Sequence, residues 1–277
     1  EKHGVNEIYF FNGRTSDTRP LYDVARLKEI SFTSLELIRE SIESYRVNEF
    51  PNSLPHDISY HYKRIVALWN KNANEETIEE AAEFFRKRRD GQLVRDRKVY
   101  TEFHQVGKLP EGFNENQKNI VIYNSSQDEF ASLGDFVEDK SLYPVHEEGL
   151  KALFKEFNGN ESYHFYLRLH PNLREVKYAY HQRLKNLGEK YYNVTVIGAD
   201  SDISSYSLLD KADQVITFGS TVGVEACFWR KPVILLAGSL YYYLDVAYIP
   251  KTEEEFFELI RSDLAPRSKE YALKFGM

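Results

Sequence analysis

Residues 214–236, QVITFGSTVGVEACFWRKPVILL, contain the pattern that decides the fold. Residues 215–218 and 233–236 are rich in β-branched and aromatic side chains, which predicts two short buried strands. Between them, a Gly-Ser-Thr break is followed by small and apolar residues up to Trp229, as a packed helix requires, and a Lys-Pro pair ends that helix. The stretch therefore predicts a parallel strand–helix–strand unit, the building block of an α/β sheet.

The loop after the first of these strands is the first candidate binding site. It lies at the carboxyl edge of the predicted sheet, where open α/β sheets bind ligands, and it opens a helix whose free N–H groups attract anions. Ser220 and Thr221 add hydroxyl donors there, so we expect a phosphate group. The same residues also suit an ordinary N-cap and tight turn. Glu225, four residues beyond Thr221, is expected to face the loop and bind ribose hydroxyls, which favours a nucleotide.

The composition excludes several classes of protein. With 36 Lys plus Arg against 43 Asp plus Glu, the net charge is −7. The chain thus has no surplus of basic residues that would indicate a nucleic-acid partner. The single cysteine, Cys227, allows no internal disulfide and indicates a reducing compartment, so we expect a cytoplasmic protein. The sequence contains no apolar run of about 18 residues, so no membrane-spanning segment is predicted. No cluster of Cys, His or acidic residues has the spacing of a metal site, so we predict no metal.

The first part of the chain predicts a strand and two helices before a linker. Residues 7–11 predict a strand that ends in the sequence FNGR, with Arg14 exposed beyond the Asn-Gly turn. Arg14 at that strand end suits a contact with a carboxylate or phosphate of a donor or acceptor, although a surface arginine has the same pattern. Two amphipathic helices are expected at 57–71 and 75–89, and residues 104–119 have the Gly, Pro and Asn content of a linker.

The second part of the chain alternates strands with helices. Strands are predicted at 119–124, 164–169 and 193–198, ahead of the two strands in the opening stretch. Helices separate these strands, and this alternation predicts a doubly wound parallel sheet. We therefore divide the chain into two domains, residues 1–113 and residues 114–277.

Polar residues follow the predicted strands at the edge where their carboxyl ends meet. Because loops at one edge of a parallel sheet face the same crevice, these side chains are expected to converge. His170, stiffened by Pro171, is a candidate phosphate donor, or else a capping or core histidine. Glu129 or Asp128 is a candidate general acid or base, or else an ordinary charge at a helix N-terminus. The remaining candidates are three serines, Ser125, Ser126 and Ser205.

Five segments resemble a known family, the bacterial capsule polysaccharide biosynthesis proteins. They are FNGR at 11–14, NSSQDEF at 124–130, LRLHPN at 167–172, SYSLLDKADQVITFGSTVGVEA at 205–226 and KPVIL at 231–235. This family is similar to GT-B glycosyltransferases, in which two Rossmann-like domains close over a nucleotide-sugar. The resemblance implies an α/β, GT-B-like fold with residues 1–113 on the acceptor side and residues 114–277 holding the nucleotide-sugar. Because 113 residues are short for a GT-B first domain, we expect further N-terminal strands outside this sequence.

The His-Pro pair and the later Ser-Thr pair are also similar to bacterial sialyltransferases and Kdo transferases, which use CMP-activated acids. This resemblance implies that His170 and the Ser-Thr pair hold the phosphate and that Glu225 holds the ribose. It makes Glu129 the first candidate for the catalytic carboxylate. The acidic motif of sialyltransferases ends in Gly, whereas Phe130 stands at that point here, so the catalytic base and the CMP preference stay open.

The function implied by the resemblance is metal-independent sugar transfer in capsule or lipopolysaccharide synthesis. The donor would be a nucleotide-sugar, with no further cofactor, and the acceptor a glycan or glycolipid. A peripheral position at the inner face of the cytoplasmic membrane, beside lipid-linked acceptors, fits this function. Two alternatives stay open because fold analogy does not fix function. They are a UDP-sugar epimerase or hydrolase, and a non-catalytic nucleotide-sugar-binding domain of a larger assembly protein.

Overall fold

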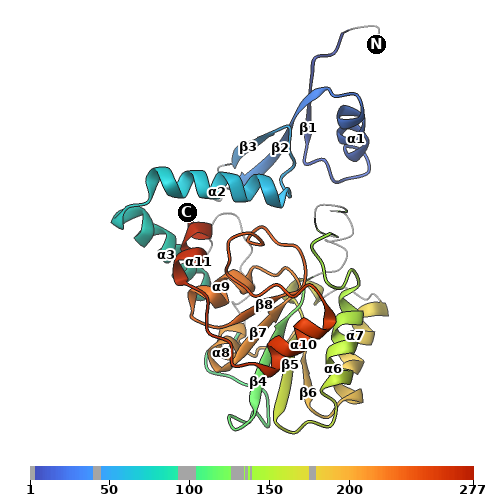
Figure 1. Cartoon of the computed structure of the whole chain (residues 1–277), viewed down its shortest axis with the longest axis vertical. Coiled ribbons are helices and arrows are strands. Elements are labelled where there is room, and N and C mark those ends of the chain that lie inside the picture. The colour runs from blue at the N-terminus through green and yellow to red at the C-terminus, as the bar shows by residue number, and fades with distance from the viewer. Residues whose placement is uncertain are drawn as a thin grey trace.

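The structure is a computed structural model that describes residues 4–39, 45–92, 104–125, 134, 137, 139–174 and 179–277. It contains two sheets, one of three strands near the N-terminus and one of five strands in the C-terminal part. The two sheets lie at opposite ends of the molecule, with a long helix between them (Figure 1).

The five-stranded sheet is entirely parallel and doubly wound. Its strands, in chain order, are β4 (Lys118–Tyr123), β5 (Tyr163–Arg168), β6 (Val194–Ile197), β7 (Gln214–Thr217) and β8 (Val233–Leu235). In space their order is β6-β5-β4-β7-β8. The chain therefore reverses its winding direction between β4 and β7, and such a switch point is where α/β sheets bind ligands. The α/β fold with a doubly wound parallel sheet is confirmed.

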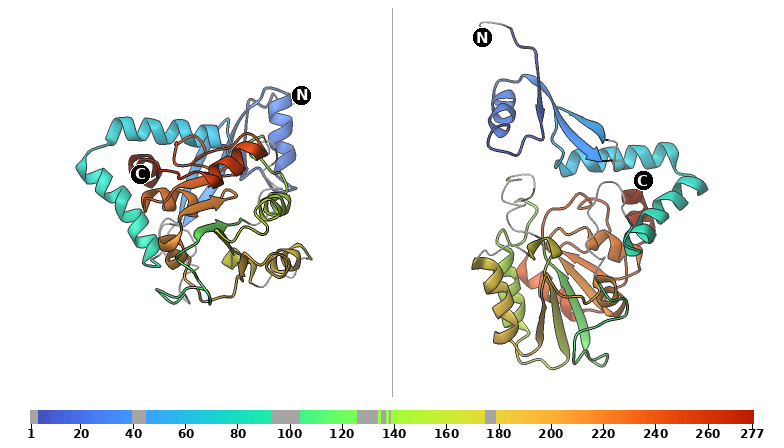
Figure 2. Two further views of the ribbon diagram at one scale, coloured as in Figure 1. Left: turned by 60° about the horizontal axis from the view of Figure 1, so that its bottom comes forward. Right: turned by 180° about the vertical axis from the view of Figure 1, so that it is seen from behind.

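Helices cover both faces of this sheet (Figures 1 and 2). One core cluster joins the sheet to α6 (His146–Glu156), α7 (Ala179–Lys190) and α10 (Glu253–Arg261). The other cluster joins it to α3 (Glu75–Arg89), α8 (Ser205–Lys211), α9 (Val222–Phe228) and α11 (Lys269–Gly276). Along β4, Ile120 and Ile122 pack on the first side and Val121 and Tyr123 on the second. This alternation follows from the two-residue period of a strand.

The predicted strand–helix–strand unit is present as β7, α9 and β8. The turn between β7 and α9 needs Gly219, whose φ of +88° lies in the left-handed region. Within α9, a Cβ atom on Gly223 would lie 2.3 Å from Tyr241 Oη and 2.8 Å from Thr217 Cγ2. Glycine at this position therefore lets the helix pack directly against Tyr241 and the end of β7.

The N-terminal sheet contains a small β-α-β unit. The unit consists of β1 (Glu7–Phe11), α1 (Arg19–Leu27) and β2 (Ser31–Arg39), and β3 (Tyr45–Pro51) completes the sheet. β1 pairs with β2 in parallel, and β3 pairs with β2 in the antiparallel direction. The core under α1 consists of apolar side chains, Phe10, Tyr22, Ala25, Phe32 and Leu54.

Two helices connect this sheet to the C-terminal part, as predicted. The N-cap of α2 (Ile58–Asn72) is Asp57, whose carboxylate accepts from the Tyr60 N–H at 2.9 Å. α3 has acidic residues in its first turn and four basic residues in its last, which suits the helix dipole. α3 packs on the C-terminal part, where the Phe85 ring stacks on Phe228 with centroids 4.3 Å apart. None of the helices in the described ranges is long and apolar enough to cross a membrane.

Candidate functional site

A pocket of about 280 Å³ lies at the switch point of the five-stranded sheet. Its walls come from the loops after β4, β5, β7 and β8, and from the N-terminal part of the chain on the other side. The residues that line it are Arg14, His56, Ile58, Ser125, Val137, His170, Gly219, Ser220, Thr221, Gly238, Ser239, Leu240 and Phe275. Apolar walls with a few convergent polar groups are typical of small-molecule sites.

Four of the residues predicted from the C-terminal sheet meet in this pocket, namely Ser125, His170, Ser220 and Thr221. The ends of β4 and β5 are tied together because the His170 backbone N–H donates to Asn124 Oδ1 at 3.0 Å. The loop after β7 is held by Tyr241, whose hydroxyl donates to the Ser220 carbonyl at 2.6 Å. Pro171 begins the short 3-10 helix η1 (Pro171–Leu173) directly after His170. The loop backbones are thus fixed by the fold itself.

Arg14 also lines the pocket, and a tight turn brings it there. Asn12 and Gly13 both have left-handed backbone conformations, with φ of +60° and +79°. A Cβ atom on Gly13 would lie 2.6 Å from Leu54 Cδ2, so only glycine fits against the small N-terminal core. The FNGR turn therefore reverses the chain after β1 and places the guanidinium of Arg14 opposite the loops of the large sheet.

His56 lines the same pocket and was missed by the sequence analysis. Burial, together with the positive charge of Arg14, lowers the pKa of His56 to about 4, so the imidazole is neutral at neutral pH. Its Nε2 lies 3.4 Å from Asn12 Oδ1, and the Asn12 amide nitrogen donates to Glu36. Because Asn12 Oδ1 accepts, Nε2 carries the proton and Nδ1 has the lone pair. Nothing local in the sequence distinguishes His56 from a loop histidine.

The loop after β8 contributes a second missed group, Ser239, which is buried beside Gly238. A sequence signal was available for this loop. The segment LLAGS at 235–239 repeats the strand-Gly-Ser pattern of ITFGS at 216–220, and both strands are neighbours in the parallel sheet. Parallel neighbours end at the same edge, so the second Gly-Ser pair reaches the same pocket.

Two of the predicted polar residues lie elsewhere, and Pro171 does not line the pocket itself. Glu225 is buried on the far side of α9, with 1% of its side chain exposed. Its Oε1 accepts from Arg88 Nε at 2.9 Å, and its Oε2 accepts from the Tyr206 hydroxyl. Ser205 is the first residue of α8, and its carbonyl accepts from the Tyr123 hydroxyl at 2.6 Å. Neither residue lines the pocket, so the structure does not bring Glu225 to a ribose position beside Ser220.

Three further candidates, Ser126, Asp128 and Glu129, lie outside the described residues. Among the described residues that line the pocket, Arg14 has the only permanent charge and none has a carboxylate. No group of three or more His, Cys, Asp or Glu residues in the described ranges has the geometry of a metal site. The described walls thus present one cation, N–H and O–H donors, and apolar surface. This arrangement favours an anionic ligand.

Comparison with known proteins identifies the family to which the chain belongs. Residues 72–248, more than half of the chain, match the model of the capsule polysaccharide biosynthesis protein family. The chain belongs to this family. The matched range includes α3, the whole five-stranded sheet and the four pocket loops that follow its strands. No curated protein matches the sequence.

Two solved structures share the fold of this capsule family member. The β-Kdo 2,4 transferase of KpsC from Thermosulfurimonas dismutans aligns over 98% of this chain and 79% of that chain, with a TM-score of 0.59 and 17% identity. The β-Kdo 2,7 transferase of KpsC from the same organism aligns over 97% of this chain and 89% of that chain, with a TM-score of 0.54 and 13% identity. These likenesses support the GT-B-like fold that the sequence predicts.

Proposed function

We propose that this capsule family member is a glycosyltransferase that transfers a sugar from a nucleotide-sugar to a glycan or glycolipid acceptor. One observation supports the proposal above the others. The pocket at the switch point joins Arg14, His170 and the hydroxyl groups of Ser125, Ser220 and Thr221, with no carboxylate among its described walls. A cation and several donors around one space suit the phosphate groups of a nucleotide.

The chemistry follows from these donors. When the bond between the anomeric carbon and the phosphate oxygen breaks, negative charge develops on the departing nucleotide. Arg14 and the hydroxyl donors of Ser220 and Thr221 would meet that charge, and the fixed loops would hold them in place before the reaction. Neutral His56 stands on the opposite wall, within the same pocket. The sequence-based proposal that Glu129, or else Asp128, supplies the catalytic carboxylate stays a prediction.

The donor class is also part of the proposal. The two KpsC structures with the same fold are Kdo transferases. That likeness, together with the His-Pro and Ser-Thr pairs, supports a donor of the CMP-activated acid class. The acceptor would lie on the side of the pocket formed by the N-terminal part of the chain.

Calorimetric titration with CMP, UDP and GDP tests this function. We expect CMP to bind, and His170→Ala and Ser220→Ala each to weaken it at least about tenfold, since a hydrogen bond to a charged group contributes about 1.5–3 kcal/mol. His164→Ala is the matched control, because His164 lies in the same strand β5 but bonds Thr195 Oγ1 at 2.8 Å, away from the pocket. A preference for UDP or GDP would keep the site and discard the CMP donor class. Binding of no nucleotide would overturn the proposal.

Turnover separates the transferase from the alternatives. Release of the nucleotide only when an acceptor is present supports transfer, and release without an acceptor indicates an epimerase or hydrolase. Tight binding with neither reaction indicates a non-catalytic binding domain. Glu129→Gln is expected to reduce turnover severely with nucleotide affinity nearly unchanged, because a general acid or base acts in the transition state. An unchanged rate would remove Glu129 from the mechanism.

A further inference from the structure

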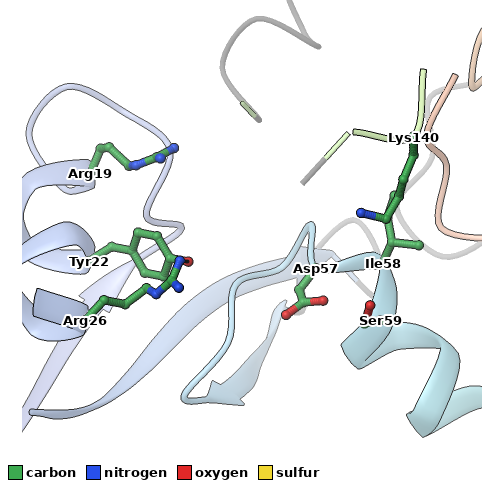
Figure 3. Close-up of a pocket in the computed structure, with 7 residues that line it drawn as sticks. All are labelled: Arg19, Tyr22, Arg26, Asp57, Ile58, Ser59 and Lys140. Carbon is green, nitrogen blue, oxygen red and sulfur yellow. Dashed lines mark hydrogen bonds between the residues drawn. The ribbon is translucent and has the colours of Figure 1, made fainter. Parts of the chain in front are cut away.

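A second pocket, of about 170 Å³, lies beside the proposed nucleotide pocket. Ile58 lines both pockets, so the two spaces are neighbours. The second pocket opens between α1 and the start of α2 (Figure 3). Its residues are Arg19, Tyr22, Arg26, Asp57, Ile58, Ser59 and Lys140.

The charges of this second pocket are mostly positive. Three cations, Arg19, Arg26 and Lys140, face one carboxylate, that of Asp57. Both Asp57 oxygens already accept hydrogen bonds, Oδ1 from the Tyr60 N–H at 2.9 Å and Oδ2 from Ser53 Oγ at 3.0 Å. Asp57 therefore serves as the N-cap of α2 and has little capacity left for the cations opposite.

Few carboxylates in the described part of the chain are near enough to neutralise these cations. Arg19 pairs with Asp23 at 3.0 Å on the outer side of α1. Within the described ranges no carboxylate lies within salt-bridge distance of Arg26 or Lys140. Among the described residues, even with Asp23 counted beside Asp57, the three cations outnumber the carboxylates by one. The pocket thus has the charge to bind an anion.

Tyr22 holds the two arginines in position. Its ring is buried and packs edge-on against Phe32 at 5.5 Å. Arg26 Nη1 donates to the Tyr22 hydroxyl at 3.2 Å, and the guanidinium carbons of Arg19 and Arg26 lie 5.4 and 5.7 Å from the centre of the ring. In Figure 3 both arginines extend on the same side as the Tyr22 ring, toward the space in front of Asp57 and Lys140. Ordered arginines lose less conformational entropy when an anion binds.

We propose that this pocket binds the carboxylate of an acidic sugar in the acceptor glycan. The inference rests on the proposed transferase function and adds the class of acceptor. Guanidinium groups bind carboxylates in a bidentate manner, and an aromatic side chain with a hydroxyl beside them suits a sugar ring. The volume is enough for one acidic group and part of its sugar, and too small for a nucleotide. With the acid held here, the acceptor would extend past Ile58 so that its hydroxyl reaches the donor in the first pocket.

The test compares trigalacturonate with its methyl ester, in which each carboxylate loses its negative charge and gains a methyl group. We expect the acid to bind the wild-type protein at least about tenfold more tightly than the ester in calorimetric titrations, as the loss of a charge-assisted contact predicts. Arg26→Gln and Lys140→Gln should each remove most of that preference. Lys28→Gln is the matched control, because Lys28 follows α1 at an exposed position outside the pocket and should leave the preference unchanged.

Each other outcome decides against a specific claim. Equal binding of acid and ester would overturn the acceptor site, and so would a preference that survives in both variants. Inorganic phosphate that binds the wild-type protein but not the variants, without any binding of trigalacturonate, would make this a free-phosphate site and overturn the acceptor claim. Nucleotide titrations of the same proteins distinguish the two proposals. A failed nucleotide titration overturns the transferase function, whereas an intact one beside equal acid and ester binding overturns only the acceptor class.

Discussion

Ser220 and Glu225 belong to the same strand–helix unit, five residues apart, yet their surroundings differ completely. Ser220 lines an open pocket with His170 and Arg14. Glu225 is enclosed by Arg88 and Tyr206 and has 1% of its side chain exposed. The loop with Ser220 offers hydrogen-bond donors to a ligand. The negative charge of Glu225, by contrast, is already paired with Arg88. The difference teaches that an acidic residue on a site helix can serve the fold instead of the ligand.

The reason lies in a helix from far away in the sequence. From the sequence, Glu225 is expected to face the loop because it lies about one helical turn beyond Thr221. Arg88, which is 137 residues from Glu225, lies at the end of α3 and reaches the carboxylate from the side that packs against α9. Burial also raises the pKa of the Tyr206 hydroxyl, with a further contribution from the Glu225 carboxylate, so this hydroxyl stays a donor.

Removal of Arg88 is the strongest way to break this comparison. Arg88→Met leaves the Glu225 carboxylate buried without its cation, so the free energy of unfolding should fall by about 3–5 kcal/mol, measured by urea denaturation. Arg89→Met is the control, because Arg89 forms an exposed pair with Asp210 and should cost no more than about 1 kcal/mol. A stable Arg88→Met protein with weakened nucleotide binding would instead assign Glu225 to the ligand.

Gly223→Ala tests the packing that separates the two sides of α9. The new Cβ atom would meet Tyr241 Oη and Thr217 Cγ2, so we expect a loss of about 1–3 kcal/mol of stability. Tyr241→Phe in the same chain removes the nearest atom and should recover part of that loss. If the double variant is no more stable than Gly223→Ala, then the Tyr241 hydroxyl does not limit the approach of the helix.

The smallest expected effect is the pH dependence of stability that arises from His146, the first residue of α6. Burial lowers the pKa of His146 to about 4, and a hydrogen bond to the Ser125 backbone opposes this shift. The unfolded chain binds the proton more readily, so this contribution to stability is complete above pH 6.5 and is lost as the pH falls toward 4. As the pH falls from 6.5 to 5.5, we expect His146 to lower the free energy of unfolding by about 1 kcal/mol.

Urea denaturation at several pH values checks the contribution of His146. His146→Gln should make the stability less dependent on pH over this range. An equally steep dependence in the variant would assign the effect to other groups, such as His56 in the pocket, whose pKa is also lowered to about 4.

The sequence by itself determined the α/β fold and the edge at which the site lies. Buried strands, their Gly-Ser breaks and the helices between them are local patterns, and the rule that parallel strands end at one edge then joins Ser125, His170 and Ser220. The tertiary structure alone decided that Arg88 pairs with Glu225, that His56 lines the pocket, and that Ile58 lines two neighbouring pockets. These contacts depend on how α2 and α3 pack against the large sheet, and local periodicity has no information on which distant side chain will occupy a given face.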